Sequence, residues 1–170
     1  MYRLLLLHSL LIGAAMSASP ALFFTPADLP ALRERIQSPE LAPVWQLILQ
    51  SAENRCNPKH AEYIDPVDPF QVGAKGEHVP DSRHQAIIVH SIGRKLDTSM
   101  ESIGFAYQLT GRKDLGRHAA AYLHAIATLY PATNETVAKG FAGGRGDVMR
   151  GLALGYDWVG ELLPEGQRKE

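Results

Sequence analysis

The chain has 170 residues, of which 45% are hydrophobic, and a formal net charge of −1. This length and hydrophobic content are those of one globular domain with a core, and they argue against intrinsic disorder. Because 17 Lys and Arg residues are balanced by 18 Asp and Glu residues, no excess positive charge is available for nucleic-acid binding, and we expect no nucleic-acid partner.

Residues 1–18 have the layout of a secretory signal peptide. Arg3 gives a cationic start, an apolar run continues to Ala15, and small residues close the segment around Ser17 and Ala18. The apolar run is shorter than the roughly 20 residues that a membrane span needs. We therefore expect the mature chain, residues 19–170, to be periplasmic or secreted and to meet the membrane only through the signal peptide. The single cysteine, Cys56, is expected to be a buried thiol without a disulfide.

Two helices are predicted at the start of the mature chain. Thr25 and Pro26 are typical of a helix N-cap and first turn, and the apolar residues that follow share one face: Leu29, Leu32 and Ile36. Residues 38–41 repeat this start signal before a second apolar face, formed by Val44, Trp45, Ile48, Leu49 and Ala52. Prolines and glycines interrupt a polar stretch from Asn57 to about Arg83, which predicts a long loop.

An antiparallel pair of helices is expected next. The first has apolar residues at steps of three or four, namely Val89, Ile92, Leu96, Met100, Ile103 and Tyr107. Gly111 ends this helix, and a second stripe soon follows, formed by Leu115, Ala119, Tyr122, Leu123, Ile126 and Leu129. Such a short connection predicts that the second helix turns back along the first.

The remaining chain is predicted to be a loop followed by a helix. We expect residues 131–146 to be irregular and Asp147 to be the N-cap of the last helix. The residues expected to face inward are Val148, Leu152, Gly155, Tyr156, Val159 and Leu162. No segment shows the alternation of a β-strand, so the predicted fold class is all-α.

Three segments resemble a known family in their order and spacing. They are residues 22–33 with a Phe-Thr pair, residues 101–111 with Phe-Ala-Tyr before a turn, and residues 151–159 with Tyr-Asp-Trp. Together they are similar to the N-terminal toroid of the heparinase II/III-like polysaccharide lyases, which include alginate and heparin lyases. The resemblance implies a partial (α/α) toroid of antiparallel helix pairs, in a protein that cleaves an acidic, uronate-containing glycan by β-elimination.

The same resemblance implies that the catalytic residues lie elsewhere. In the family, the catalytic asparagine, histidine and tyrosine follow the Tyr-Asp-Trp helix, and this chain ends soon after Trp158. We therefore expect residues 19–170 to be an incomplete, inactive N-terminal part of the lyase domain. No catalytic residue is assigned to this chain.

A uronate ligand calls for cationic side chains, and one candidate is the segment around residues 143–150. Arg145 and Arg150 can pair with a carboxylate through their guanidinium forks. The glycines of this segment would let the backbone approach a ligand, and the following helix would offer free N–H groups. The alternative is a flexible turn with solvated arginines and Asp147 as a simple helix cap.

A second candidate is a polar row on the helix before Gly111. Its members, at steps of four, three and four, are His90, Arg94, Asp97 and Glu101. Arg94 and Glu101 are candidate substrate-binding residues, and the alternative is a solvated face with salt bridges. Tyr156 is a third candidate, as an aromatic platform for a sugar, although we expect one of Tyr156 and Trp158 to pack between helices.

No metal or cofactor is expected. His84 and His90 are six residues apart, as are His118 and His124, which is not the spacing of two ligands on adjacent helical turns. Two other functions remain open: a glycoside hydrolase on the same architecture, which would need paired carboxylates, and a non-catalytic helical domain that binds a glycan or a protein.

Overall fold

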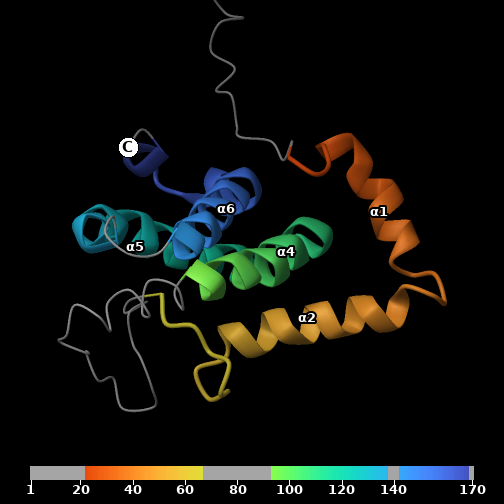
Figure 1. Ribbon diagram of the computed structural model, residues 1–170. Coiled ribbons are helices and arrows are strands. Elements are labelled where there is room, and N and C mark those ends of the chain that lie inside the picture. The colour runs from red at the N-terminus through yellow and green to blue at the C-terminus, as the bar shows by residue number, and fades with distance from the viewer. Residues whose placement is uncertain (1–21, 67–92, 138–141, 169–170) are drawn as a thin grey trace, which may run out of the picture.

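The computed structural model describes residues 22–66, 93–137 and 142–168, and its regular elements there are all helices (Figure 1). In chain order they are η1 (Pro26–Asp28), α1 (Leu29–Arg35), α2 (Ala42–Cys56), helical residues 93–99, η2 (Met100–Gly104), α4 (Phe105–Thr110), α5 (Lys113–Val137), α6 (Ala142–Val159), η3 (Gly160–Leu162) and η4 (Glu165–Arg168). The all-α prediction is confirmed for these residues. No helix among them is long and apolar enough to cross a membrane.

α1 starts where the sequence predicts a helix start. The backbone N–H and the hydroxyl of Thr25 both donate to Asp28 Oδ2 at 2.7 Å, and these bonds hold the pKa of Asp28 below its usual value. At the other end of α1, Arg33 donates to the carbonyls of Leu109 at 2.8 Å and Gln108 at 3.0 Å. These carbonyls lie at the C-terminal end of α4, where intrahelical partners run out. Arg33 therefore ties α1 to α4.

Residues 93–110 form one continuous helix, here named the central helix, which lies between α2 and α6 (Figure 1). Its predicted apolar stripe is confirmed where it is described, since Leu96, Met100, Ile103 and Tyr107 are buried. Gly111 ends the helix with a left-handed φ of 69°, a conformation that favours glycine. Val89 and Ile92 lie outside the described residues.

α5 turns back after Gly111 and packs on both α4 and η2, as the short connection predicts. The inward residues of its stripe are confirmed as buried: Leu115, Ala119, Tyr122, Leu123 and Ile126. The side chain of Leu129 lies outside the described part of the chain. The buried faces of α5, α6 and the central helix thus form the centre of the core.

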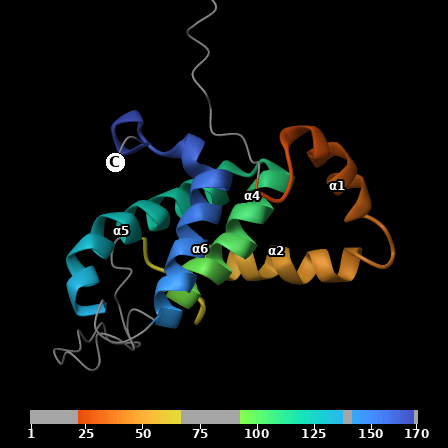
Figure 2. The ribbon, with the colours of Figure 1, turned by 45° about the horizontal axis from the view of Figure 1, so that its top comes forward.

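Figure 2 shows α6 beside the central helix, and two glycines of α6 allow this close approach. A Cβ atom at Gly151 would lie 2.6 Å from Leu96 Cγ and 2.9 Å from the backbone nitrogen of Asp97. A Cβ atom at Gly155 would lie 2.6 Å from Leu123 Cδ1. Since carbon atoms pack at about 3.5–4.0 Å, any side chain at either position would push α6 away from its neighbours.

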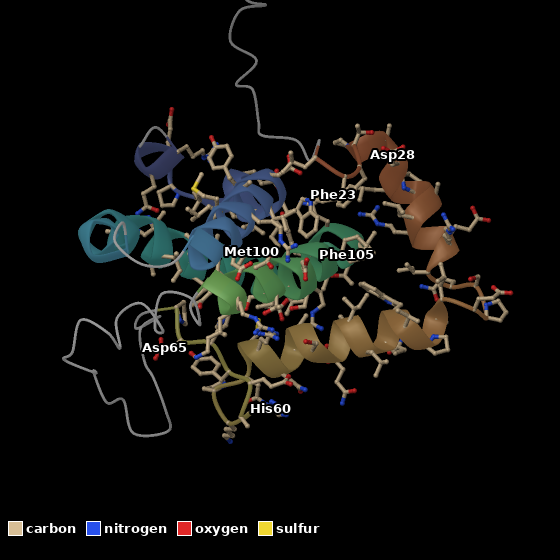
Figure 3. The ribbon with its side chains drawn as sticks, in the orientation of Figure 1. Phe23, Asp28, His60, Asp65, Met100 and Phe105 are labelled. Atoms are coloured by element: carbon tan, nitrogen blue, oxygen red, sulfur yellow. The ribbon has the colours of Figure 1, made fainter. Side chains whose placement is uncertain are left out.

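An aromatic cluster joins the N-terminal segment to α2, the central helix and α6. Trp158 stacks on Phe24 with ring centroids 5.7 Å apart, and Phe105 lies 5.9 Å from each of these rings. Trp45 meets Phe105 edge-on at 6.2 Å, and Phe23 lies 6.3 Å from Trp158. Figure 3 shows Phe23 and Phe105 within this region of the molecule. Trp158 is therefore the aromatic residue of the Tyr-Asp-Trp helix that packs between helices.

Two predictions about the boundaries of the last helices are wrong. α5 continues to Val137 and α6 begins at Ala142, so most of residues 131–146 are helical rather than a loop. Asp147 therefore lies inside α6 and is not its N-cap. Proline and glycine oppose a helix by about 3 and about 1 kcal/mol, but packing of α5 and α6 on each other and on η2 supplies stabilisation that local sequence does not reveal.

Two predictions about helix faces are also wrong. Tyr156 is 46% exposed rather than inward, and Val44 is 51% exposed although it was assigned to the apolar face of the second helix. Neighbouring residues on a helix project about 100° apart, so the burial of Trp158 and Trp45 fixes which face turns inward. The second helix also begins at Ala42, after a turn formed by residues 38–41.

His118 of α5 holds the turn that follows α2. Its Nε2 lies 3.0 Å from the carbonyl oxygen of Ile64, and its ring centroid lies 5.7 Å from that of Tyr63. Burial lowers the pKa of His118, although the Ile64 hydrogen bond and the charge of Asp65 oppose this change.

This lowered pKa predicts a loss of stability in mild acid. Below about pH 6.5 the unfolded chain binds a proton on His118 that the folded chain binds only at lower pH. The free energy of unfolding should therefore fall as the pH decreases through this range. Between about pH 7 and about pH 5, the melting temperature of the wild type should fall further than that of His118→Gln, whose amide can still donate to Ile64. Equal decreases of the melting temperature in the wild type and in His118→Gln would contradict this role of His118.

Candidate functional site

The structure brings together two polar segments that the sequence offered as separate candidates. Arg150 on α6 donates from Nε to Asp97 Oδ1 at 2.6 Å, and its Nη2 contacts Asp97 Oδ2. The same Nη2 lies 3.3 Å from Glu101 Oε1. Asp97, Glu101 and Arg150, here named the Arg150 cluster, therefore link α6 to the central helix.

The Arg150 cluster has one buried side and one exposed side. The side chain of Asp97 is 4% exposed, whereas those of Arg150 and Glu101 are 57% and 50% exposed. The hydrogen bond and the charge of Asp97, with smaller contributions from Glu101 and Asp147, raise the pKa of Arg150. A buried carboxylate thus holds a permanently cationic guanidinium at the surface.

The central helix is widened beside this cluster. Met100–Gly104 form a π-helical turn, in which the N–H of Phe105 donates to the carbonyl of Met100, five residues earlier. Turns of this kind are rare and occur frequently at functional sites. Nearby hydroxyls donate to carbonyls four residues back, a pattern that bends helices, and they belong to Thr98, Ser99 and Ser102. In the sequence, these three hydroxyl residues are the signal that could have predicted the π-helical turn.

Other predicted site residues lie apart from the cluster or beyond the described side chains. Arg94 is exposed one turn before Asp97 on the central helix. Tyr156 lies on a different part of α6, where its hydroxyl is 3.5 Å from the carbonyl of Arg168. Arg145 lies in the first turn of α6, but its side chain is outside the described part, and His90 is outside the described residues.

The predicted glycine-rich turn before Asp147 is helical where the structure describes it. Residues 142–146 are helical, so the backbone N–H groups that follow Asp147 lie inside α6 and are not free at a helix start. Arg150 lies more than two turns beyond the first residue of α6. Its role depends on Asp97 instead of on the glycines before it.

No known protein family, curated protein or solved structure matches this chain. The function of the cluster is therefore inferred from its chemistry. Among the residues that the structure describes, no three His, Cys, Asp or Glu side chains gather closely enough to hold a metal ion.

A cavity of about 250 Å³ between α1 and α2 is a poor place for a sugar. Its walls are almost wholly apolar and are formed by Leu32, Arg35, Ile36, Leu41, Val44, Trp45, Ile48 and Phe105. Sugar hydroxyls placed there would lose hydrogen bonds to water without gaining partners, at a cost of roughly 1–3 kcal/mol each.

The Arg150 cluster can bind a ligand that carries both carboxylates and hydroxyls. Two bonds to Asp97 fix the orientation of the guanidinium, so little side-chain entropy is lost on binding. The contact with Glu101 is longer, at 3.3 Å, and a ligand carboxylate can replace it. Glu101 would then be free to accept a sugar hydroxyl.

Proposed function

We propose that this chain forms part of the helical toroid of an exported polysaccharide lyase and binds an acidic, uronate-containing glycan there. The observation that carries the proposal is Arg150, held at the surface by the buried carboxylate of Asp97 beside a π-helical turn. The all-helical arrangement is compatible with a toroid of helix pairs.

Eliminative cleavage of a uronate linkage requires three contributions. The sugar carboxylate must be neutralised, a base must take the proton from C5, and an acid must protonate the leaving oxygen. Arg150 suits the first of these through the donors that Asp97 does not use, namely the N–H groups of Nη1 and the second N–H of Nη2, which point toward Glu101 or a ligand carboxylate. No residue of the described part is assigned as the base or the acid.

The lyase is tested with the whole protein that carries this chain. It is incubated with alginate, heparan sulfate, other uronate polysaccharides and a neutral glucan as control, while the ultraviolet absorbance of an unsaturated uronate product is followed. We expect this absorbance to rise with at least one uronate polysaccharide and to stay constant with the glucan. New reducing ends without the absorbance would identify a hydrolase instead, and binding without cleavage would identify a non-catalytic domain. Either result contradicts the lyase.

A further inference from the structure

The apolar cavity between α1 and α2 has the size of a small-molecule site. α1 and α2 form the two arms of a bend (Figure 1), and Phe105 of α4 contributes to the cavity that they enclose. The volume of the cavity is about 250 Å³. Because an apolar cavity of about 150 Å³ is large enough to bind benzene, this cavity has room for a hydrocarbon group of about eight carbon atoms.

The inner wall of this cavity is aromatic and aliphatic. Trp45 of α2 is 5% exposed, and its ring meets the ring of Phe105 edge-on at 6.2 Å. Leu32, Ile36 and Ile48 extend this wall and are partly buried. A hydrocarbon group in contact with these side chains leaves water, and the binding free energy gains in proportion to the apolar area removed from water.

Arg35 gives the rim of the cavity a positive charge. It is an exposed residue at the end of α1 and the one charged residue among those that line the cavity. Within the described part of the chain the ion pairs belong to Arg112 and Arg150, and Arg35 forms none there. An anionic group at the rim therefore does not have to displace a carboxylate of the protein. An apolar wall with a cationic rim is complementary to a ligand that joins a hydrocarbon body to one carboxylate.

We propose that this cavity binds a monocarboxylate with a hydrocarbon body of about eight carbon atoms, such as a medium-chain fatty acid. The hydrocarbon lies against Trp45 and Phe105, and the carboxylate lies at the rim beside Arg35. The cavity shares no residue with the Arg150 cluster. This second site therefore does not depend on the proposed lyase.

The test is isothermal titration calorimetry of this chain with octanoate, below the concentration at which octanoate forms micelles. We expect a dissociation constant of about 1 mM or lower. Octylammonium has the same hydrocarbon chain and the opposite charge, and should bind on the order of threefold to tenfold more weakly. Acetate, which lacks the hydrocarbon chain, should not bind measurably. The absence of octanoate binding, equal affinities for octanoate and octylammonium, or acetate binding as tight as that of octanoate would overturn the proposal.

Arg35→Glu tests the charge at the rim. This variant should reverse the preference, so that octylammonium binds more tightly than octanoate. Its control is Arg117→Glu, which makes the same change of charge at an exposed site on α5 and should keep the preference of the wild type. Reversal in both variants would show that net charge determines the preference, and would contradict the role of Arg35.

Val44→Phe tests whether the ligand lies in the cavity. Val44 lines the cavity and is 51% exposed, so a larger side chain fills the space without disturbing the core. We expect the affinity for octanoate to fall by about fivefold or more, through loss of buried apolar area. The control is Leu47→Phe on the same helix, because Leu47 is 67% exposed and does not line the cavity. Unchanged octanoate affinity in Val44→Phe would place the ligand elsewhere and contradict the proposal.

Sedimentation equilibrium of the ligand-free chain distinguishes a small ligand from a second copy of the chain as the occupant of the cavity. We expect a monomer. A dimer that Val44→Phe dissociates would show that a second copy covers the cavity, and would overturn the proposal. Arg150→Ala should leave octanoate binding unchanged, so that failure of the proposed lyase and failure of this site are distinguishable.

Discussion

Replacing Gly151 by Ala should destabilise the chain by about 1–3 kcal/mol, the usual cost of overpacking a core. The added Cβ atom would lie 2.6 Å from Leu96 Cγ and 2.9 Å from the backbone nitrogen of Asp97. Because one of these atoms belongs to the backbone, a side-chain rotation cannot relieve both contacts. Chemical denaturation followed by circular dichroism measures the change.

Gly146→Ala is the matched control, in the same helix and with the same added atom. Nothing lies within 4 Å of a Cβ atom at Gly146. Since alanine is favoured over glycine in a helix by about 0.5–1 kcal/mol, this variant should be more stable than the wild type. If Gly151→Ala were stabilised to the same extent, α6 could not pack against the central helix as described.

Replacing Arg150 by Ala should weaken the binding of acidic oligosaccharides by about tenfold to a hundredfold, the usual effect of losing charge-assisted hydrogen bonds. Isothermal titration calorimetry measures the affinity. Arg117→Ala removes the same charge from an exposed site on α5 and should change the affinity little. Similar losses in both variants would show that only net charge attracts the glycan.

Asp97→Asn separates orientation from charge at the same site. Simple electrostatics predicts that loss of an acidic group strengthens the binding of an anionic glycan. We expect weaker binding instead, because the neutral amide can no longer hold the guanidinium of Arg150 in place through a bidentate charged pair. Tighter binding by Asp97→Asn would contradict the positioning role of Asp97.

The sequence predicted those parts of the fold that depend on local pattern. The apolar stripe from Leu96 to Tyr107 follows from helical periodicity, and the end of the central helix follows from the tolerance of Gly111 for positive φ. The cap at Thr25 follows from its position directly before Pro26, and the structure adds its bonds to Asp28. In each case the decisive residues are close together in the chain.

The features that the sequence did not predict correctly depend on contacts between residues far apart in the chain. Asp97 and Arg150 are 53 residues apart, so the sequence places them in two separate candidate segments and does not predict their contact. Residues 131–146 were read as a loop because proline and glycine disfavour a helix locally, whereas packing on the neighbouring helices decides their structure. The sequence places Gly155 on the inward face, but it does not predict the close approach at Gly151 and Gly155, which is visible only when the opposing side chains are known.

The unpartnered hydroxyl of Tyr122, described within the part of the chain that the structure covers, was missed for a related reason. Tyr122 was assigned to an apolar stripe, which is correct for its ring. Whether a buried tyrosine hydroxyl has a partner depends on the two helices that pack against it. That information is not contained in the periodicity of α5.

The measurement that tests the central claim most directly compares an acidic and a neutral oligosaccharide of equal length for binding to this chain. The claim predicts that the uronate ligand binds more tightly, that added salt weakens this binding through screening, and that Arg150→Ala removes the preference. Equal affinities for the two ligands, or a preference for the uronate that survives Arg150→Ala, would contradict it.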